Sequence, residues 1–201
     1  MITPQAVWTD DPAADILRTA REPQIGWLLL GSHRSVFGRD FRGGVVREIL
    51  EAAQTLPINV GIVIHHEQRP LERVFAVIDQ SSDGRAALDL ATRIAQQEEC
   101  NLHAVVVPRR AGEPDVELLR MLSEAARKVG RRLHSDVLVS PDAAQLARQT
   151  PGGLVIVGAG FADRLGLSPD GFADGRAAVL VQGSSAAPAR HGAGVGMQRR
   201  A

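Results

Sequence analysis

Several residue types are scarce in this sequence, and each scarcity excludes a class of protein. There is one cysteine, Cys100, so no internal disulfide can form, which suits a reducing compartment. Aromatic residues make up 3% of the chain and tyrosine is absent, which disfavours the base-stacking platforms of proteins that bind single-stranded nucleic acid. No apolar run approaches the roughly 20 residues needed to span a bilayer.

An excess of charge of either sign is also missing. Lysine plus arginine and aspartate plus glutamate each number 23. A protein that binds DNA or RNA needs a basic face to displace counterions from the phosphates, and a polybasic membrane surface needs a similar excess. We therefore expect no nucleic-acid partner. The segment 1–11 lacks the basic and apolar pattern of a signal peptide, which predicts a cytoplasmic protein.

Motifs that carry catalysis or bind metals are absent too. The sequence contains no Gly-x-Ser-x-Gly elbow, no Walker loop and no zinc-type cluster of cysteine and histidine. His65 and His66 are adjacent, so their side chains point to opposite faces of a strand and are poorly placed to share a metal. A linker is the plainer interpretation, with pH sensing as the alternative. Cys100 has acidic neighbours that disfavour the thiolate. We expect neither an enzyme nor a metal site.

The apolar residues that are present fall in short continuous runs rather than in alternation. Such runs are typical of strands buried on both faces of a parallel sheet, and they lie at Trp27–Leu30, Ile58–Ile64, Val74–Ile78, Leu102–Val107, Val137–Val139, Leu154–Val157 and Ala177–Val181. Segments with helical spacing separate most of them, and Ser81 or Ser82 is placed to cap the helix that begins near Gly84. This alternation predicts an α/β protein with an open, Rossmann-like parallel sheet and helices on both faces.

One pattern occurs twice. A strand ends at Gly31 and is followed thirteen residues later by Gly44; another ends at Gly158 and is followed thirteen residues later by Gly171. An alanine-rich helical segment precedes each strand, which supports a duplication. The second copy has a full front half, whereas the first keeps only a rear half with a helix over 43–54. We predict a partial unit at 1–65, a linker at 66–72, a complete unit at 73–182 and a disordered tail at 183–201.

Two stretches resemble known families. Residues 73–79, Ser81 and the helical run Arg85–Ala91 resemble the opening of a universal stress protein, in which a strand ends in Asp-x-Ser. Residues 27–34 and 43–50 resemble the cytosolic C-terminal region of Kef-like monovalent cation:proton antiporters, where stress-protein-like units follow the membrane domain. The resemblance covers about residues 5 to 182.

The resemblance implies a nucleotide site. Family members that bind ATP use Gly-x2-Gly-x9-Gly followed by Ser or Thr. The matching positions here keep the outer glycines but lack the middle glycine and the hydroxyl, and they read Gly31, Arg34, Gly44, Val45 in the first copy and Gly158, Phe161, Gly171, Phe172 in the second. Glycine lets backbone N–H groups approach a phosphate, so this departure predicts weak ATP binding. Arg34, beside His33, could replace part of the loop by charge.

Asp79 and Ser81 complete the implied site. The resemblance places Asp79 against an adenine or a ribose, with Gly158 and Gly160 presenting backbone N–H groups to a phosphate. The plainer alternative is that Asp79 caps a helix. A ligand with fewer or differently placed phosphates than ATP, such as AMP or a cyclic nucleotide, is expected to fit better.

Two functions remain open. The first is a regulatory domain of a cation:proton antiporter that senses an adenine or cyclic nucleotide, with the transport domain as its partner. The incomplete first copy favours it, because half a unit at a chain start suggests missing upstream sequence. The alternative is a free-standing stress-type protein that binds nucleotide or other proteins. Either way we predict a homodimer that pairs through strands 58–64 and 177–181, which end the two copies and are the expected sheet edges.

Overall fold

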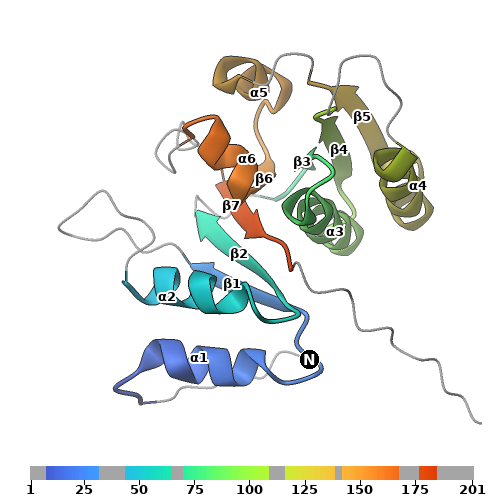
Figure 1. The fold of residues 1–201 in the computed structure, drawn as a ribbon. Coiled ribbons are helices and arrows are strands. Elements are labelled where there is room, and N and C mark those ends of the chain that lie inside the picture. Colours follow the sequence, from blue (N-terminus) through green and yellow to red (C-terminus); the bar gives the residue numbers. More distant parts are fainter. Residues whose placement is uncertain are drawn as a thin grey trace, which may run out of the picture.

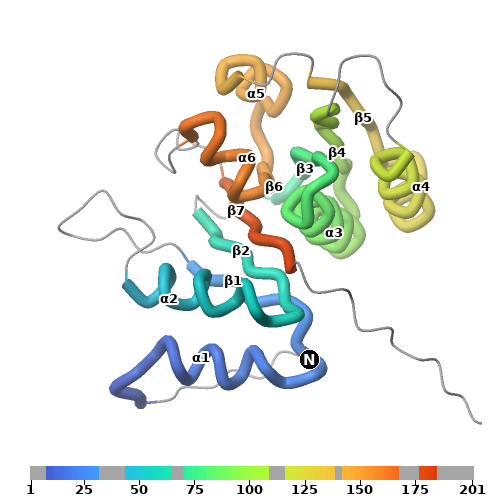
Figure 2. Tube along the Cα trace, in the orientation of Figure 1, coloured from blue at the N-terminus to red at the C-terminus, as the bar shows by residue number. Residues whose placement is uncertain are grey.

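A computed structural model describes residues 8–31, 44–64, 70–108, 116–138, 142–167 and 177–184 (Figures 1 and 2). The helices are α1 Pro12–Ala20, α2 Gly44–Ala53, α3 Ser82–Gln97, α4 Val116–Val129, α5 Ala143–Gln149 and α6 Ala159–Arg164, with a short 3-10 turn at Gly130–Arg132. The strands are β1 Trp27–Gly31, β2 Asn59–Ile64, β3 Arg73–Ile78, β4 Asn101–Val106, β5 Leu133–Val137, β6 Leu154–Gly158 and β7 Ala177–Gln182.

The strands form one seven-stranded sheet in the order β1-β2-β7-β6-β3-β4-β5. Every neighbouring pair is parallel except β2 and β7, which run antiparallel. The predicted open sheet is therefore confirmed, with one antiparallel junction that the sequence did not reveal. Within 73–182 the chain follows the doubly wound arrangement, because β3 has β4 on one side and β6 on the other.

Helices cover both faces of the sheet. One face packs against α3 and α4, and its core contains Ile156, Leu102 and Ala91. The other face packs against α5 and α6 over one part of the sheet and against α1 and α2 over the other. Central strands are buried on both faces, which explains their continuous apolar sequence. Among the described residues, no helix combines the length and the apolar character needed to cross a membrane.

The local signals at the start of α3 were read correctly. Ser81 is the N-cap, and its Oγ accepts a hydrogen bond from the N–H of Gly84 at 3.0 Å. Two other elements differ from expectation. The strand expected at Val137–Val139 is β5, which begins at Leu133 and ends at Val137 and is mostly exposed. A helix, α6, begins directly after Gly158, where a phosphate-binding loop was expected.

The strands expected to be free edges pair with each other. Residue 62 of β2 lies opposite residue 180 of β7, and the antiparallel ladder runs from Val60 with Gln182 to Ile64 with Ala178. The edge assignment was wrong because β2, the last strand before residue 66, and β7, the last strand before residue 183, pair with each other within one chain. The edges of the described sheet are β1 and β5. Homodimer formation itself stays a prediction.

A side-chain contact reinforces this junction. The indole Nε1 of Trp27, on β1, donates a hydrogen bond to Oδ2 of Asp89, on α3, at 3.1 Å. The same oxygen accepts from Nε of Arg93 at 2.8 Å. Trp27 therefore lies at the contact between β1 and α3, so its fluorescence is sensitive to that contact.

Because one sheet runs through both units, we expect the protein to unfold as a single cooperative body. The tryptophan fluorescence of a Trp8→Phe variant, which leaves Trp27 as the only tryptophan, should follow the same urea transition as far-UV circular dichroism. Leu180→Ala, at the buried β2·β7 junction, should lower the free energy of unfolding by about 2–5 kcal/mol and shift both signals together. Val45→Ala, at an exposed site on α2, is the control. Two separated transitions would show that the units are independent.

Candidate functional site

The carboxyl ends of three parallel strands meet the N-terminus of α3. These strands are β3, β6 and β7, and the position lies where the strand order reverses, which is where open α/β sheets bind ligands. The structure brings four of the predicted site residues to this place: Asp79 and Ser81 after β3, and Gly158 and Gly160 at the β6–α6 connection.

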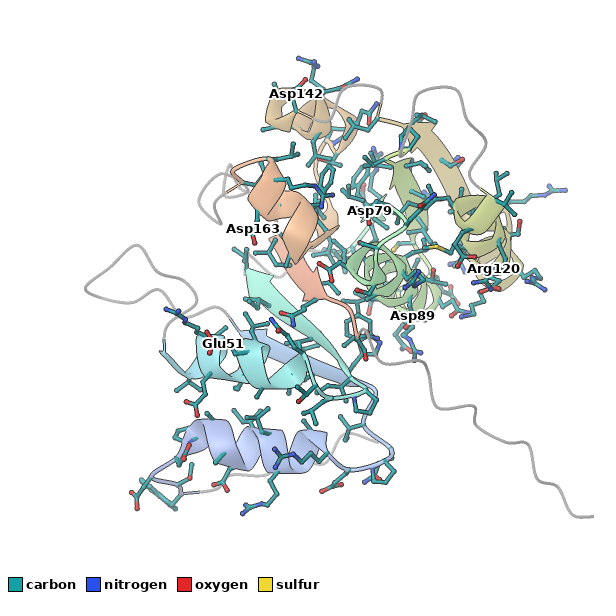
Figure 3. The ribbon with its side chains drawn as sticks, viewed as in Figure 1. Glu51, Asp79, Asp89, Arg120, Asp142 and Asp163 are labelled. Carbon is teal, nitrogen blue, oxygen red and sulfur yellow. The ribbon has the colours of Figure 1, made fainter. Side chains whose placement is uncertain are left out.

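Asp79 is engaged on both carboxylate oxygens. Its Oδ1 accepts hydrogen bonds from the backbone N–H of Ser81 at 3.1 Å and from the Ser81 hydroxyl. Its Oδ2 forms an ion pair with Nη2 of Arg164, on α6, at 3.0 Å. The Asp79 side chain is 18% exposed, and Figure 3 shows it between the start of α3 and α6. A ribose or base that bonded to Asp79 would have to displace Arg164.

The carboxylate of Asp83 connects three segments of the site through hydrogen bonds. Its Oδ2 accepts a hydrogen bond from the backbone N–H of Gly160 at 3.1 Å, and its Oδ1 accepts one from the N–H of Gly183, just after β7, at 2.8 Å. One carboxylate in the first turn of α3 therefore binds the backbone of two other segments. It also lies where a negative charge is favoured by the helix dipole.

The backbone comes very close at this point. A Cβ added to Gly158 would lie 2.7 Å from the Cβ of Asp83, and one added to Gly183 would collide with the backbone carbonyl of Ser82. Glycine at both positions lets β6 and β7 approach the start of α3 closely enough for the Asp83 bonds to form. The sequence-based argument assigned the close approach of Gly158 to a phosphate; in the structure its neighbour is the Asp83 side chain.

A cavity of about 600 Å³ adjoins the Asp83 bonds. It lies over the β2·β7 junction, between α2 and α6. Its apolar lining comes from Leu50, Ile62 and Leu180, and its polar lining includes Gln54, Thr55, Asp83, Asp163 and Gln182. Figure 3 shows Asp163 on α6, on the side that faces α2. The volume is within the range of small-molecule sites.

The described lining of this cavity carries negative charge. Two carboxylates line it, from Asp83 and Asp163, and no lysine or arginine of the described residues does so. The N–H groups of Gly160 and Gly183, which would suit an anion, already donate to Asp83. Carboxylates and amide groups instead match a ligand that presents hydroxyl or amino hydrogens.

The remaining predicted residues lie elsewhere. Gly31 ends β1, at the far edge of the sheet from β3, and Gly44 begins α2. The structure therefore does not bring the two copies of the glycine pattern into one site. His33, Arg34, His65, His66 and Gly171 lie outside the described residues. Of the predicted glycines that the structure describes, Gly160 alone is among the residues that line the cavity.

Sequence reasoning missed Asp83 and Arg164. Asp83 sits in the first turn of a helix, where an acidic residue has an ordinary explanation as a partner of the helix dipole. Arg164 is 85 positions from Asp79, and nothing local marks it. Cys100, which was judged unreactive, is buried, and burial raises the pKa of its thiol.

Comparison with known proteins places the fold. No known family model matches the sequence, and no curated protein matches it. Among solved structures the chain is similar to a universal stress protein from Archaeoglobus fulgidus, with a TM-score of 0.55 and 16% identity over 87% of this chain and 66% of that one. It is also similar to the cytoplasmic domain of a prokaryotic cation chloride cotransporter, with a TM-score of 0.58 and 16% identity over 85% of this chain and 69% of that one.

These likenesses define the class of the fold. The fold is universal-stress-protein-like, as the residues around Asp79 predicted. The chain spans slightly less than two thirds of the length of the stress protein. A domain of a cation transporter shares the same architecture.

Removing the Asp83 carboxylate should loosen the site. Asp83→Ala leaves the N–H groups of Gly160 and Gly183 without their acceptor, and each unsatisfied group costs on the order of 1–3 kcal/mol. We expect a clear drop in the urea midpoint for Asp83→Ala and a smaller one for Asp83→Asn, which keeps one acceptor oxygen. Asp10→Ala, at an exposed position, should leave the midpoint unchanged. Equal midpoints for Asp83→Ala and the wild type would show that these bonds contribute nothing to stability.

Proposed function

We propose that this chain is a cytosolic regulatory domain of a cation transporter of the cation:proton antiporter type. One observation carries the proposal. The strands of residues 1–65 and those of residues 73–182 are joined in a single sheet through β2 and β7, and a cytoplasmic domain of a cation transporter has a similar architecture over most of this chain. The resemblance of residues 27–34 and 43–50 to antiporter tails supports the antiporter in particular.

The position of the cavity suits a regulator. Its lining comes from α2 and β2 of the first unit and from α3, α6 and β7 of the second. A ligand there contacts both units at once, so its affinity depends on how they are arranged. Binding would then favour one arrangement over another, which is what a regulatory domain must transmit to an attached transport domain.

The lining residues also restrict the class of ligand that the cavity can bind. Leu50, Ile62 and Leu180 offer an apolar surface for a flat base, and the carboxylates of Asp83 and Asp163 accept hydrogen bonds from hydroxyl or amino groups. The ligand we propose is a nucleoside or a nucleotide with few phosphates. Each added phosphate brings negative charge toward these carboxylates.

A free-standing stress-type protein that binds nucleotide is the second candidate, because the similarity to the universal stress protein covers an equally large part of this chain. It shares the ligand with the first proposal and differs in lacking a transport partner. Transport measurements, rather than binding measurements, distinguish the two candidate functions.

Ligand preference is tested by calorimetry with adenosine, AMP, cyclic AMP, cyclic di-AMP and ATP. We expect affinity to fall as phosphates are added and Asp83→Asn to improve binding of ATP relative to adenosine. Asp163→Asn should weaken a ligand held in the cavity, while Asp79→Ala should leave it unchanged. If Asp79→Ala abolishes binding and Asp163→Asn does not, the ligand lies against Asp79, where the resemblance placed it. No binding of any of these compounds at millimolar concentration would rule out the nucleotide class.

The transport role is tested in the cells from which the chain comes. Deleting the coding segment for residues 73–182 should change the rate of cation-dependent proton flux in everted membrane vesicles, because the flux is then no longer biased by the domain. Reintroducing the wild-type segment should restore the flux, and Asp163→Asn should restore it without its response to the ligand. An unchanged flux after the deletion would favour the free-standing protein.

A further inference from the structure

We propose that β5 is a self-association edge, through which two copies of this chain pair antiparallel about a twofold axis at Ser135. The sheet then continues from one copy into the other. This surface is separate from the cavity and from the residues around Asp79, and the proposal does not depend on the ligand.

The location of β5 leaves one side open. It ends the seven-stranded sheet, and among the described residues its only strand neighbour is β4. Four of its five residues are exposed, in contrast to the buried strands at the centre of the sheet. Figure 1 shows β5 and α4 together at one end of the molecule. An uncovered edge strand presents backbone donors and acceptors to another chain.

The hydrogen bonds to β4 decide which backbone groups face outward. The N–H of Leu138 donates to the carbonyl of Val106, on β4, at 2.8 Å. Backbone groups alternate in direction along a strand, so residues 134 and 136 also face β4, and the backbone of Ser135 and Val137 faces the open side. The carbonyl of Leu133 faces the open side as well, whereas its N–H already donates to the carbonyl of Gly130. The carbonyl of Val137 accepts a side-chain hydrogen bond from Nε2 of Gln149 at 3.3 Å, and it has a second lone pair.

This alternation restricts how two copies of β5 can pair. In an antiparallel pair the outward residues must lie opposite outward residues, so the twofold axis has to pass through a residue of β5 and cannot pass between two residues. Only an axis at Ser135 pairs the strand along its whole length. Ser135 then faces Ser135 of the second copy as a hydrogen-bonded pair. Leu133 faces Val137, and in that pair the N–H of Val137 donates to the carbonyl of Leu133.

The same register brings complementary side chains together. His134 lies opposite Asp136 of the second copy, and Asp136 opposite its His134, in the non-hydrogen-bonded positions where side chains approach most closely. The imidazole donates to the carboxylate in both symmetric pairs. His134 is already held in place on its own chain, because its ring stacks on His103, on β4, with the centroids 4.8 Å apart.

An apolar patch lies on the other face of the same edge. Val137 is 53% exposed, and on α4, which covers this face, Val116 is 79% and Leu119 is 55% exposed. A twofold axis perpendicular to the sheet places the two copies of α4 on the same face, on either side of the paired strands. The exposed apolar residues of both copies then approach each other across the axis.

The other edge lacks this complementarity. β1 exposes Leu29, which is 51% accessible, but its sequence Trp27-Leu28-Leu29-Leu30-Gly31 contains no charged residue that could fix a register. Because β1 is the other edge of the described sheet, a dimer through β1 is the main competing arrangement. The experiment must distinguish it from pairing through β5.

A charge-swap series followed by sedimentation equilibrium is the direct test. His134→Asp places two aspartates opposite each other in both symmetric pairs, and Asp136→His places two histidines there. Each single variant should weaken the dimer by roughly tenfold or more, because like side chains replace complementary ones. The double variant, with both substitutions, restores an Asp–His pair at each position and should recover most of the affinity. Circular dichroism confirms that each variant is folded.

A second series tests the patch and the backbone. Val137→Lys and Leu119→Lys should weaken the dimer to a similar extent, whereas Val45→Lys, at an exposed valine on α2 that lies away from this edge, should not. Ser135→Pro removes an outward N–H while leaving the bonds to β4 intact, so it should give a monomer.

Three results would overturn the proposal. They are a wild-type chain that is monomeric at hundreds of micromolar, a dimer that is insensitive to the β5 substitutions, and a dimer that is lost with Leu29→Lys instead. The last result would assign the interface to β1.

Discussion

The antiparallel ladder between β2 and β7 is the contact on which the rest of the structure depends. A terminal strand of each unit would otherwise expose its backbone to water and to other chains. Pairing the two strands satisfies both edges inside one chain and extends the sheet across the two units. It also positions α2 opposite α6 and so creates the cavity between them. Without this ladder there would be neither a common core nor a site that both units share.

Asp83, like the ladder, joins segments that are far apart in the sequence, and it does so through the hydrogen bonds of one side chain. Its carboxylate ties the start of α3 to the segments that follow β6 and β7, and two glycines permit the approach. The result is an anion-binding arrangement of backbone N–H groups that is occupied by the protein's own carboxylate. The same carboxylate, together with Asp163, contributes to the polar lining of the adjacent cavity.

Much of the fold was accessible from the sequence because it rests on local signals. Short buried runs rich in valine and isoleucine identified the strands, and Ser81 identified the start of α3. The Asp-x-Ser segment at 79–81 predicted the class of fold, which the structural comparisons confirm. The partners within the site were less accessible. Arg164 pairs with Asp79 across 85 positions, and α6 replaced the expected loop, because such contacts depend on how distant segments pack and leave no local pattern.

The sequence by itself determined the strands, most of the helices, the parallel α/β class and the absence of recognisable catalytic motifs, because hydrophobic periodicity and capping act within a few residues. Only the tertiary structure decided which strands are edges. The composition of β2 and β7 does not indicate which strand each of them pairs with. Their pairing with each other depends on how the two parts of the chain pack together. β5 carries His134 and Asp136, and their significance is visible only once β5 is known to be the last strand of the sheet. An edge strand differs from a central strand in having a neighbouring strand on one side instead of two. Which strands are neighbours is decided only when the chain folds.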